Sequence, residues 1–323
     1  MSNPKEITSR LNNLMLRATK KQRKCGFKDC REPTARNHTV SNCLINNFVE
    51  NGHVRMLAVD PWKSYNLSFN RVGSNEATTF HGLCNAHDSE VFLPIDKVDL
   101  NPFLYQNQIL LAYRSVLQEK LKKTIKKEVY SQFSDEFKHI SNPGVLRARK
   151  FSKMFEYNLF NAVWYEERLL SDLENNTQKF LFKTLKLPYF DLAGSELNTF
   201  EADASINLKR SFYESYGHFE PFADIFISLL PNPNKEYLTA VLGSHEKDNK
   251  KLFALYEQLN NTPPLKCLSD ILLLYMDGWV CSEHFYNKHL KHQLQLFAKV
   301  FEKTSEISAS LRHTSFNLFG QKD

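Results

Sequence analysis

Glycine and cysteine are both scarce in this chain, with ten and six residues among 323. So few glycines disfavour the glycine-rich loops that cradle nucleotide phosphates, and Gly194-Ser195 lacks the flanking pattern of a hydrolase nucleophile elbow. Six cysteines are too sparse for a disulfide scaffold. No stretch approaches the roughly 18 apolar residues of a membrane span, and the N-terminus lacks the apolar core of a secretion signal. We therefore expect a cytoplasmic protein with no membrane partner.

The composition that is present favours a folded chain. Hydrophobic residues make up 42% and aromatic residues 13% of the sequence, which is enough to bury a core. At roughly 100–200 residues per domain, the length predicts about two domains. No repeat of fixed period is present.

The excess of positive charge is confined to one short segment. Residues 17–36 hold eight basic and two acidic side chains, which accounts for the whole net charge of +6, while the rest of the chain carries 34 groups of each sign. A local patch of this kind indicates a polyanionic partner, and we favour nucleic acid over an acidic protein. The candidate nucleic-acid-binding residues are Lys20, Lys21, Arg23, Lys24, Lys28, Arg31 and Arg36.

The first hundred residues differ in composition from the rest. A short amphipathic helix is expected over residues 5–22. Residues 25–100 hold four of the six cysteines and four of the eleven histidines, with short β-like runs at 53–59, 64–70 and 77–80. Because the residue before a proline is pushed out of the helical region, Asn101-Pro102 is the expected boundary. We predict domains at 1–101 and 102–323.

The second region is predicted to be mainly helical with a short β-sheet. Helical spacing extends from residue 103 to about 187, interrupted at Asn142-Pro143-Gly144. Alternating apolar residues predict a strand over 198–211, and two apolar runs around a proline-containing turn predict a strand–turn–strand over 222–242. Further helices are expected at 250–259, 265–275 and 284–303. The predicted fold class is therefore α+β. We expect residues 102–323 to act as a sensor or to bind a protein partner.

Two pairs of residues at metal-ligand spacing carry the main chemical signal. Four possible ligands, separated as Cys-x4-Cys and Cys-x2-His, are Cys25, Cys30, Cys84 and His87. Pairs on two tight turns joined by one ion form the usual structural zinc site, and Gly26 and Gly82 lie where such turns are needed. Zinc is favoured over ordinary buried thiols. Cys43 or His81 could replace one ligand.

The surroundings of these pairs resemble the HNH (His-Me finger) nucleases that carry a structural zinc. Residues 36–42 read Arg-Asn-His-Thr-Val-Ser-Asn, and residues 83–88 read Leu-Cys-Asn-Ala-His-Asp. The resemblance implies a zinc-stapled ββα or treble-clef-like module, in which Cys25, Cys30, Cys84 and His87 bind zinc. It also implies that His38 is the general base and that Asp88 binds a catalytic Mg²⁺ or Mn²⁺. Asn37 stands where many members have a metal-binding Asp.

Such residues support hydrolysis of a phosphodiester. An imidazole suits the base because its unperturbed pKa lies near neutral pH. A hard divalent cation accepts one or two protein oxygens and keeps waters, so that a single Asp with a second weak ligand can suffice.

The chain also resembles a group of bacterial proteins without an established activity. Their pattern is a Cys pair, Ser-His-x-Ile-Ser/Pro, Glu-Asn-Gly-His-Val and Thr-Phe-x-Gly-Phe-Cys-x2-His-Asp, followed by a helix with Tyr-Arg. Matching segments here lie at residues 37–42, 51–54 and 73–88, and at Ala112-Tyr113-Arg114.

Together these patterns predict an HNH-like endonuclease directed at DNA or RNA, and the resemblance implies a place in bacterial antiviral defence. The alternative is a zinc-dependent module that binds nucleic acid or protein without cleaving it.

Overall fold

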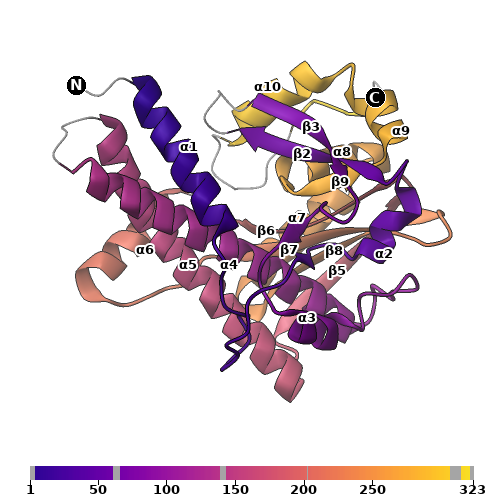
Figure 1. Cartoon of the computed structure of the whole chain (residues 1–323). Coiled ribbons are helices and arrows are strands. Elements are labelled where there is room, and N and C mark those ends of the chain that lie inside the picture. Colours follow the sequence, from indigo (N-terminus) through magenta and orange to yellow (C-terminus); the bar gives the residue numbers. More distant parts are fainter. Residues whose placement is uncertain (1–3, 61–65, 139–142, 202, 306–313, 321–323) are drawn as a thin grey trace.

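A seven-stranded sheet forms the centre of the protein, as seen in the computed structural model (Figure 1). The structure describes residues 4–60, 66–138, 143–201, 203–305 and 314–320. All neighbouring strands of this sheet are antiparallel. Their order is β3 (Asn66–Gly73), β2 (His53–Asp60), β9 (Trp279–Cys281), β6 (Leu192–Thr199), β7 (Asp224–Pro231), β8 (Tyr237–His245) and β5 (Phe180–Pro188).

Both faces of the central strands are covered. Side chains of a strand alternate between its two faces. In β7, Ile225, Ile227 and Leu229 join one hydrophobic core, whereas Phe226 and Leu230 join the other. The sequence of β7 is therefore mainly apolar on both faces, with Asp224 and Ser228 as exceptions, and does not alternate between apolar and polar residues.

The helices of the C-terminal part cover one face. Leu252 and Leu255, for example, share the core of Ile227. The helix at Pro264–Leu274 has a proline in its first turn, which supplies the fixed φ that a helix start requires. These elements are α7 (Asn249–Asn260), α8 (Pro264–Leu274), α9 (Glu283–Phe285), a π-helical turn (Tyr286–Leu290) and α10 (Leu294–Ser305).

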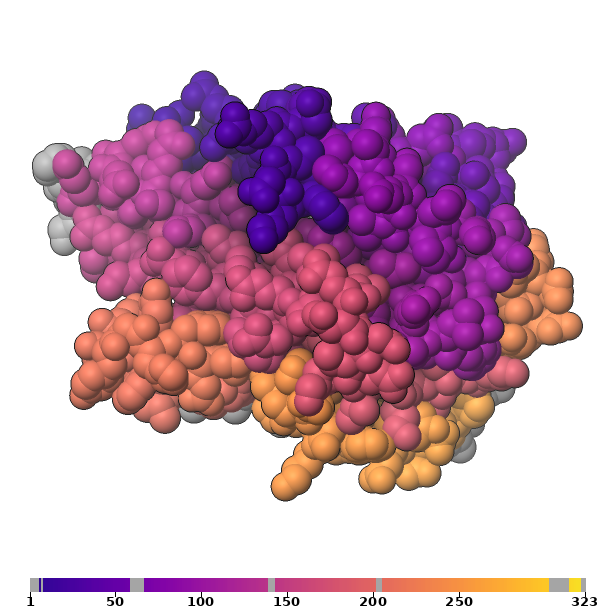
Figure 2. Space-filling model, turned by 90° about the horizontal axis from the view of Figure 1, so that it is seen from below, coloured from indigo at the N-terminus to yellow at the C-terminus, as the bar shows by residue number. Residues whose placement is uncertain are grey.

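Two long helices cover the other face, α4 (Tyr105–Glu136) and α5 (Pro143–Asn175). The first helix, α1 (Pro4–Lys20), packs Leu11 and Leu14 against the end of α4. In Figure 2 the N-terminal residues, indigo to purple, form a continuous surface with these two magenta to pink helices. A further helix, α6 (Asp203–Tyr216), lies to one side of them (Figure 1).

The residues of the candidate metal site lie around a second, two-stranded sheet. Strand β1 (Asn37–His38) pairs antiparallel with β4 (Thr79–Phe80), and α3 (Asn85–Phe92) follows directly. The hairpin of β2 and β3 is inserted between β1 and β4, together with α2 (Asn42–Ile45) and a 3₁₀ turn (Asn46–Phe48). This small β–β–α unit shares the core of α4: Leu83 and Phe92 pack with Val116.

The mixed α/β character is as expected, but the sheet is larger than predicted. Its strands come from both sides of residue 101, because β2 pairs with β9 through Arg55↔Cys281 and Met56↔Val280. The expected boundary itself falls in the connection between α3 and α4.

Most predicted helices and the β7–β8 hairpin are confirmed. The predicted strand over 198–211 is wrong, because β6 ends at Thr199 and α6 begins at Asp203. Phe200 is buried but Leu208 is exposed on α6, so the apparent alternation joined two elements with different surroundings. The helical prediction is also wrong over β5, whose residues pair with β8 along the whole strand. The expected β-like run at 64–70 begins outside the described residues.

No helix among the described residues has both the length and the apolar character needed to span a bilayer.

Candidate metal centre

Two tight turns bring the predicted ligands together. In the first, the N–H of Cys25 donates to Glu32 O (2.8 Å) and that of Cys30 to Phe27 O (3.2 Å). Asp29 has a φ of +62°, a left-handed conformation that Asp tolerates better than most residues. The turn therefore reverses the chain within a few residues and places both thiols on the same side.

The second pair is set by the start of α3. Cys84 caps the helix and His87 lies in its first turn, where the N–H of Asp88 donates to Cys84 O (2.9 Å). The two turns are joined by a hydrogen bond from Gly26 N to Gly82 O (2.8 Å). A Cβ on Gly26 would lie only 3.2 Å from that oxygen, so the close approach of the two backbones favours glycine.

The four side chains converge on one point. The ligand atoms of Cys25, Cys30, Cys84 and His87 all lie within 4.8 Å of one another. His87 Nδ1 is 3.2 Å from the sulfur of Cys84 and 3.5 Å from that of Cys25. Its ring stacks on Phe27, with ring centroids 4.1 Å apart. This cluster of three sulfurs and one nitrogen can hold a metal ion.

The surroundings favour ionisation of one of the three thiols, that of Cys84. The sulfur of Cys25 accepts from the N–H groups of Cys84 (3.2 Å) and Phe27 (3.5 Å). The backbone N–H of His87, with further help from Cys25, lowers the pKa of Cys84 to about 7. Thiolates are the form in which cysteine binds metals. The other candidate ligands do not belong to the cluster: Cys43 contacts Ser41 Oγ (2.9 Å) and His81 is exposed.

His38, the expected base, lies on β1 opposite Thr79. Its Nδ1 is 3.0 Å from the carbonyl oxygen of Ala77, so Nδ1–H donates and Nε2 is the acceptor. Burial lowers the pKa of His38. The imidazole is therefore held in its neutral form with one nitrogen able to accept a proton.

Asp88 lies on α3, next to the last ligand of the cluster. Its Oδ1 is buried and has no hydrogen-bond partner among the described residues. Burial raises the pKa of this carboxyl, and the charge of Arg114 opposes the shift. An unpaired buried oxygen of this kind is costly unless something binds it.

An ion pair that the sequence did not reveal, between Arg114 and Asp96, acts on both His38 and Asp88. Arg114 on α4 is only 1% exposed. It donates to both carboxylate oxygens of Asp96 (2.9 and 2.7 Å) and stacks on Phe92, 4.1 Å from the ring centroid. The charges of Arg114 and Asp96 both act on the pKa of His38 and of Asp88. The four groups thus form one electrostatic neighbourhood, which we call the Arg114 cluster.

Asn37 has a structural role. Its Oδ1 accepts from the N–H groups of Gly82 (2.9 Å) and Leu83 (2.7 Å), and its Nδ2 donates to Leu83 O (3.3 Å). The side chain thereby fixes the loop that leads into Cys84. Because both N–H groups already use its oxygen, Asn37 is not available as a metal ligand.

Six of the seven candidate nucleic-acid-binding residues are exposed. Arg23 is the exception: it donates to Ala18 O at the end of α1 (2.8 Å) and to Glu128 on α4 (2.9 Å). Two of the others contact acids, Lys21 with Glu128 at 3.4 Å and Arg36 with Glu76 at 3.9 Å. Four are exposed without such an ion pair among the described residues: Lys20, Lys24, Lys28 and Arg31.

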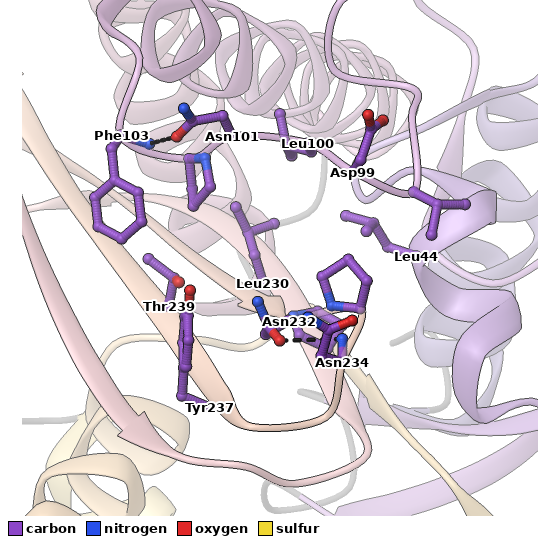
Figure 3. Close-up of a pocket in the computed structure, with 14 residues that line it drawn as sticks. Leu44, Asp99, Leu100, Asn101, Phe103, Leu230, Asn232, Asn234, Tyr237 and Thr239 are labelled. Carbon is purple, nitrogen blue, oxygen red and sulfur yellow. Dashed lines mark hydrogen bonds between the residues drawn. The ribbon is translucent and has the colours of Figure 1, made fainter.

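A cavity of about 300 Å³ is lined by none of these residues (Figure 3). It forms where the segment 98–103 meets the turn between β7 and β8. Its amides are mostly engaged within these segments, since Asn101 Oδ1 accepts from Phe103 N and Asn232 Oδ1 from Asn234 N, both at 3.0 Å. The polar lining therefore stabilises two turns.

Comparisons of the chain with models of protein families, with curated proteins and with solved structures find no match.

Proposed function

We propose that this protein is an HNH-like, metal-dependent endonuclease whose zinc site holds a β–β–α catalytic unit. One observation carries the proposal: His38 on β1 and Asp88 on α3 both lie in the field of the same ion pair, Arg114 with Asp96. The metal-ligand cluster ends one residue before Asp88. A candidate base and a candidate carboxylate thus belong to the small β–β–α unit that contains the metal-ligand cluster.

Zinc is the metal that suits the four ligands. Three sulfurs and one imidazole nitrogen form a common structural zinc set, and four protein ligands leave no open position for a substrate. The role of zinc at this site is therefore to hold the two turns together. The hydrogen bonds to the sulfur of Cys25 are typical of the outer shell that orients such ligands.

The proposed reaction is hydrolysis of a phosphodiester. His38 Nε2 takes a proton from a water molecule as the water attacks phosphorus, while Ala77 O keeps the ring oriented through Nδ1. The free Oδ1 of Asp88 fits a hard cation. Mg²⁺ or Mn²⁺ bound there would supply positive charge to the phosphate and the leaving oxygen. The exposed basic segment holds the nucleic-acid backbone.

A non-catalytic binding module is the second candidate, and one observation favours it. The guanidinium of Arg114 already places a positive charge beside Asp88, and the oxygen of Asn37 is engaged by two N–H groups. In this alternative, Arg114 balances the carboxylate in place of a divalent cation. The basic segment would then bind nucleic acid without cleavage.

Cleavage assays with two histidine variants separate these candidates. The zinc-loaded protein is incubated with plasmid DNA and with RNA, in Mg²⁺ or Mn²⁺. His53 is the matched control for His38, because its Nδ1 also contacts a backbone carbonyl, Asn51 O at 2.7 Å. We expect His38→Ala to abolish cleavage and His53→Ala to retain it. Cleavage that persists in His38→Ala would reject this base, and salt-sensitive binding without cleavage in any metal would support the binding module.

A further inference from the structure

A small cavity of about 110 Å³ lies between the metal-site turns and α4. Three stretches of chain meet there: the basic segment, the loop before Cys84 and the middle of α4. Basic side chains, two glycines and Thr124 line it together with Leu117 and Leu121, and no carboxylate lines it. The residues that carry the argument are Arg23, Lys24, Gly26, His81, Gly82 and Lys120.

Two of the basic groups are held in place by acids outside the cavity. Arg23 pairs with Glu128 at 2.9 Å, and Lys120 pairs with Glu166. The long side chains are thereby ordered before any ligand arrives, which lowers the entropy cost of binding. These acids also neutralise part of the positive charge, so the cavity needs further groups that can donate a hydrogen bond to an anion.

Lys24 and His81 supply the groups that face solvent. Both side chains are exposed, and neither has an ion-pair partner among the described residues. The glycine contact that joins the two metal-site turns also fixes the distance between them, because Gly26 N donates to Gly82 O directly. The sequence offered His81 as an alternative metal ligand, whereas in the structure this residue lines the cavity.

We propose that this cavity binds one phosphate group of a nucleic acid; the inference rests on the proposed function and assigns a phosphate position to it. Lysine and arginine make short, charge-assisted hydrogen bonds to phosphate oxygens. A volume of about 110 Å³ is comparable with three or four water molecules at about 30 Å³ each, which is enough for a phosphate that displaces them. The exposed Lys20, Lys28 and Arg31 continue the positive surface along the same segment.

The test measures binding rather than cleavage, without divalent cations. Zinc-loaded full-length protein is titrated into a fluorescent single-stranded oligonucleotide, with and without a 5′-phosphate, over a series of salt concentrations. The variant is Lys24→Ala with His81→Ala, and the control is Lys250→Ala with His284→Ala, two exposed residues that do not line the cavity. Zinc content and thermal unfolding check that both proteins are folded.

We expect the variant to bind about tenfold more weakly, with a salt slope about 0.7 shallower for each lost phosphate contact. The control should match the wild type. If the cavity takes a terminal phosphate, the variant loses the preference for the 5′-phosphorylated strand; if it takes an internal phosphodiester, both strands weaken equally.

A second measurement tests phosphate binding by the cavity independently of nuclease activity. Inorganic phosphate is titrated into protein labelled with ¹⁵N-histidine, and the ring signals of His81 are followed. Saturable shifts that disappear in Lys24→Ala support the site, even if no cleavage is ever observed. The proposal is overturned if the double variant keeps wild-type affinity and salt slope, or if phosphate leaves the His81 signals unchanged.

Discussion

Removal of the Asp96 carboxylate tests whether the Arg114–Asp96 ion pair stabilises the fold. Arg114 is 1% exposed, and two of its N–H groups donate to Asp96. Its Nε has no partner among the described residues. In Asp96→Asn, a buried guanidinium would keep Phe92 as a stacking partner and lose the anion that it contacts directly.

The size of the effect follows from the burial of the two partners. Removing one partner of a buried ion pair costs about 3–5 kcal/mol, because the other charge remains buried and unpaired. Asp96 is 33% exposed, so water can replace part of the lost interaction. We therefore expect Asp96→Asn to lower the free energy of unfolding by about 2 kcal/mol.

Urea unfolding of the zinc-loaded protein, followed by tryptophan fluorescence, measures this change. Asp99→Asn is the control, since Asp99 is exposed and should alter stability by less than about 0.5 kcal/mol. Adding Arg114→Met to Asp96→Asn should recover stability, because the unpaired charge is removed as well. A cost below about 0.5 kcal/mol for Asp96→Asn, or no recovery in the double variant, would refute the reasoning.

Three further predictions concern the metal site and the sheet. Cys25→Ser should lose stoichiometric zinc by elemental analysis while the core cysteine variant Cys267→Ser keeps it; zinc retained in Cys25→Ser would reject the ligand set. Gly82→Ala should lower stability by about 1–3 kcal/mol, since its Cβ would lie 2.5 Å from the Phe80 ring, whereas Gly73→Ala meets no atom within 4 Å. Burial raises the pKa of Asp224 to about 7, so its stabilising proton is present at low pH and is lost as pH rises toward 7. The free energy of unfolding of Asp224→Asn, relative to that of the wild type, should therefore rise by about 2–3 kcal/mol between about pH 5 and pH 8. Thermal unfolding at several pH values measures this, and a difference between the two proteins that is independent of pH would contradict it.

Local patterns in the sequence predicted much of the site. The spacing of Cys25, Cys30, Cys84 and His87 is a local signal, because each pair depends only on its own turn, and the four residues do converge. The Arg114 cluster was missed because Asp96 and Arg114 lie on different elements. The available signal was an arginine amid the apolar residues 109–117 of a helix, which calls for a buried partner but does not say which one.

The large sheet was harder to predict because its pairings are distant in sequence. Strand β9 has only three residues, too few for an alternating pattern, yet it pairs with both β2 and β6 and so joins the two halves of the sheet. Strand β7 is buried on both faces, so its sequence is mainly apolar and lacks the alternation of a half-exposed strand. Helix α6 places Leu208 in solvent, so its apolar residues do not mark a buried face.

The metal site and the large sheet share one hydrophobic core. Cys25 and Cys84 belong to the same hydrophobic core as Phe226 and Val241 of the sheet. Arg55 of β2 also forms a two-pronged ion pair with Glu283 at 2.8 Å. The four ligands are therefore packed against the same core as the sheet, with no flexible linker between the two.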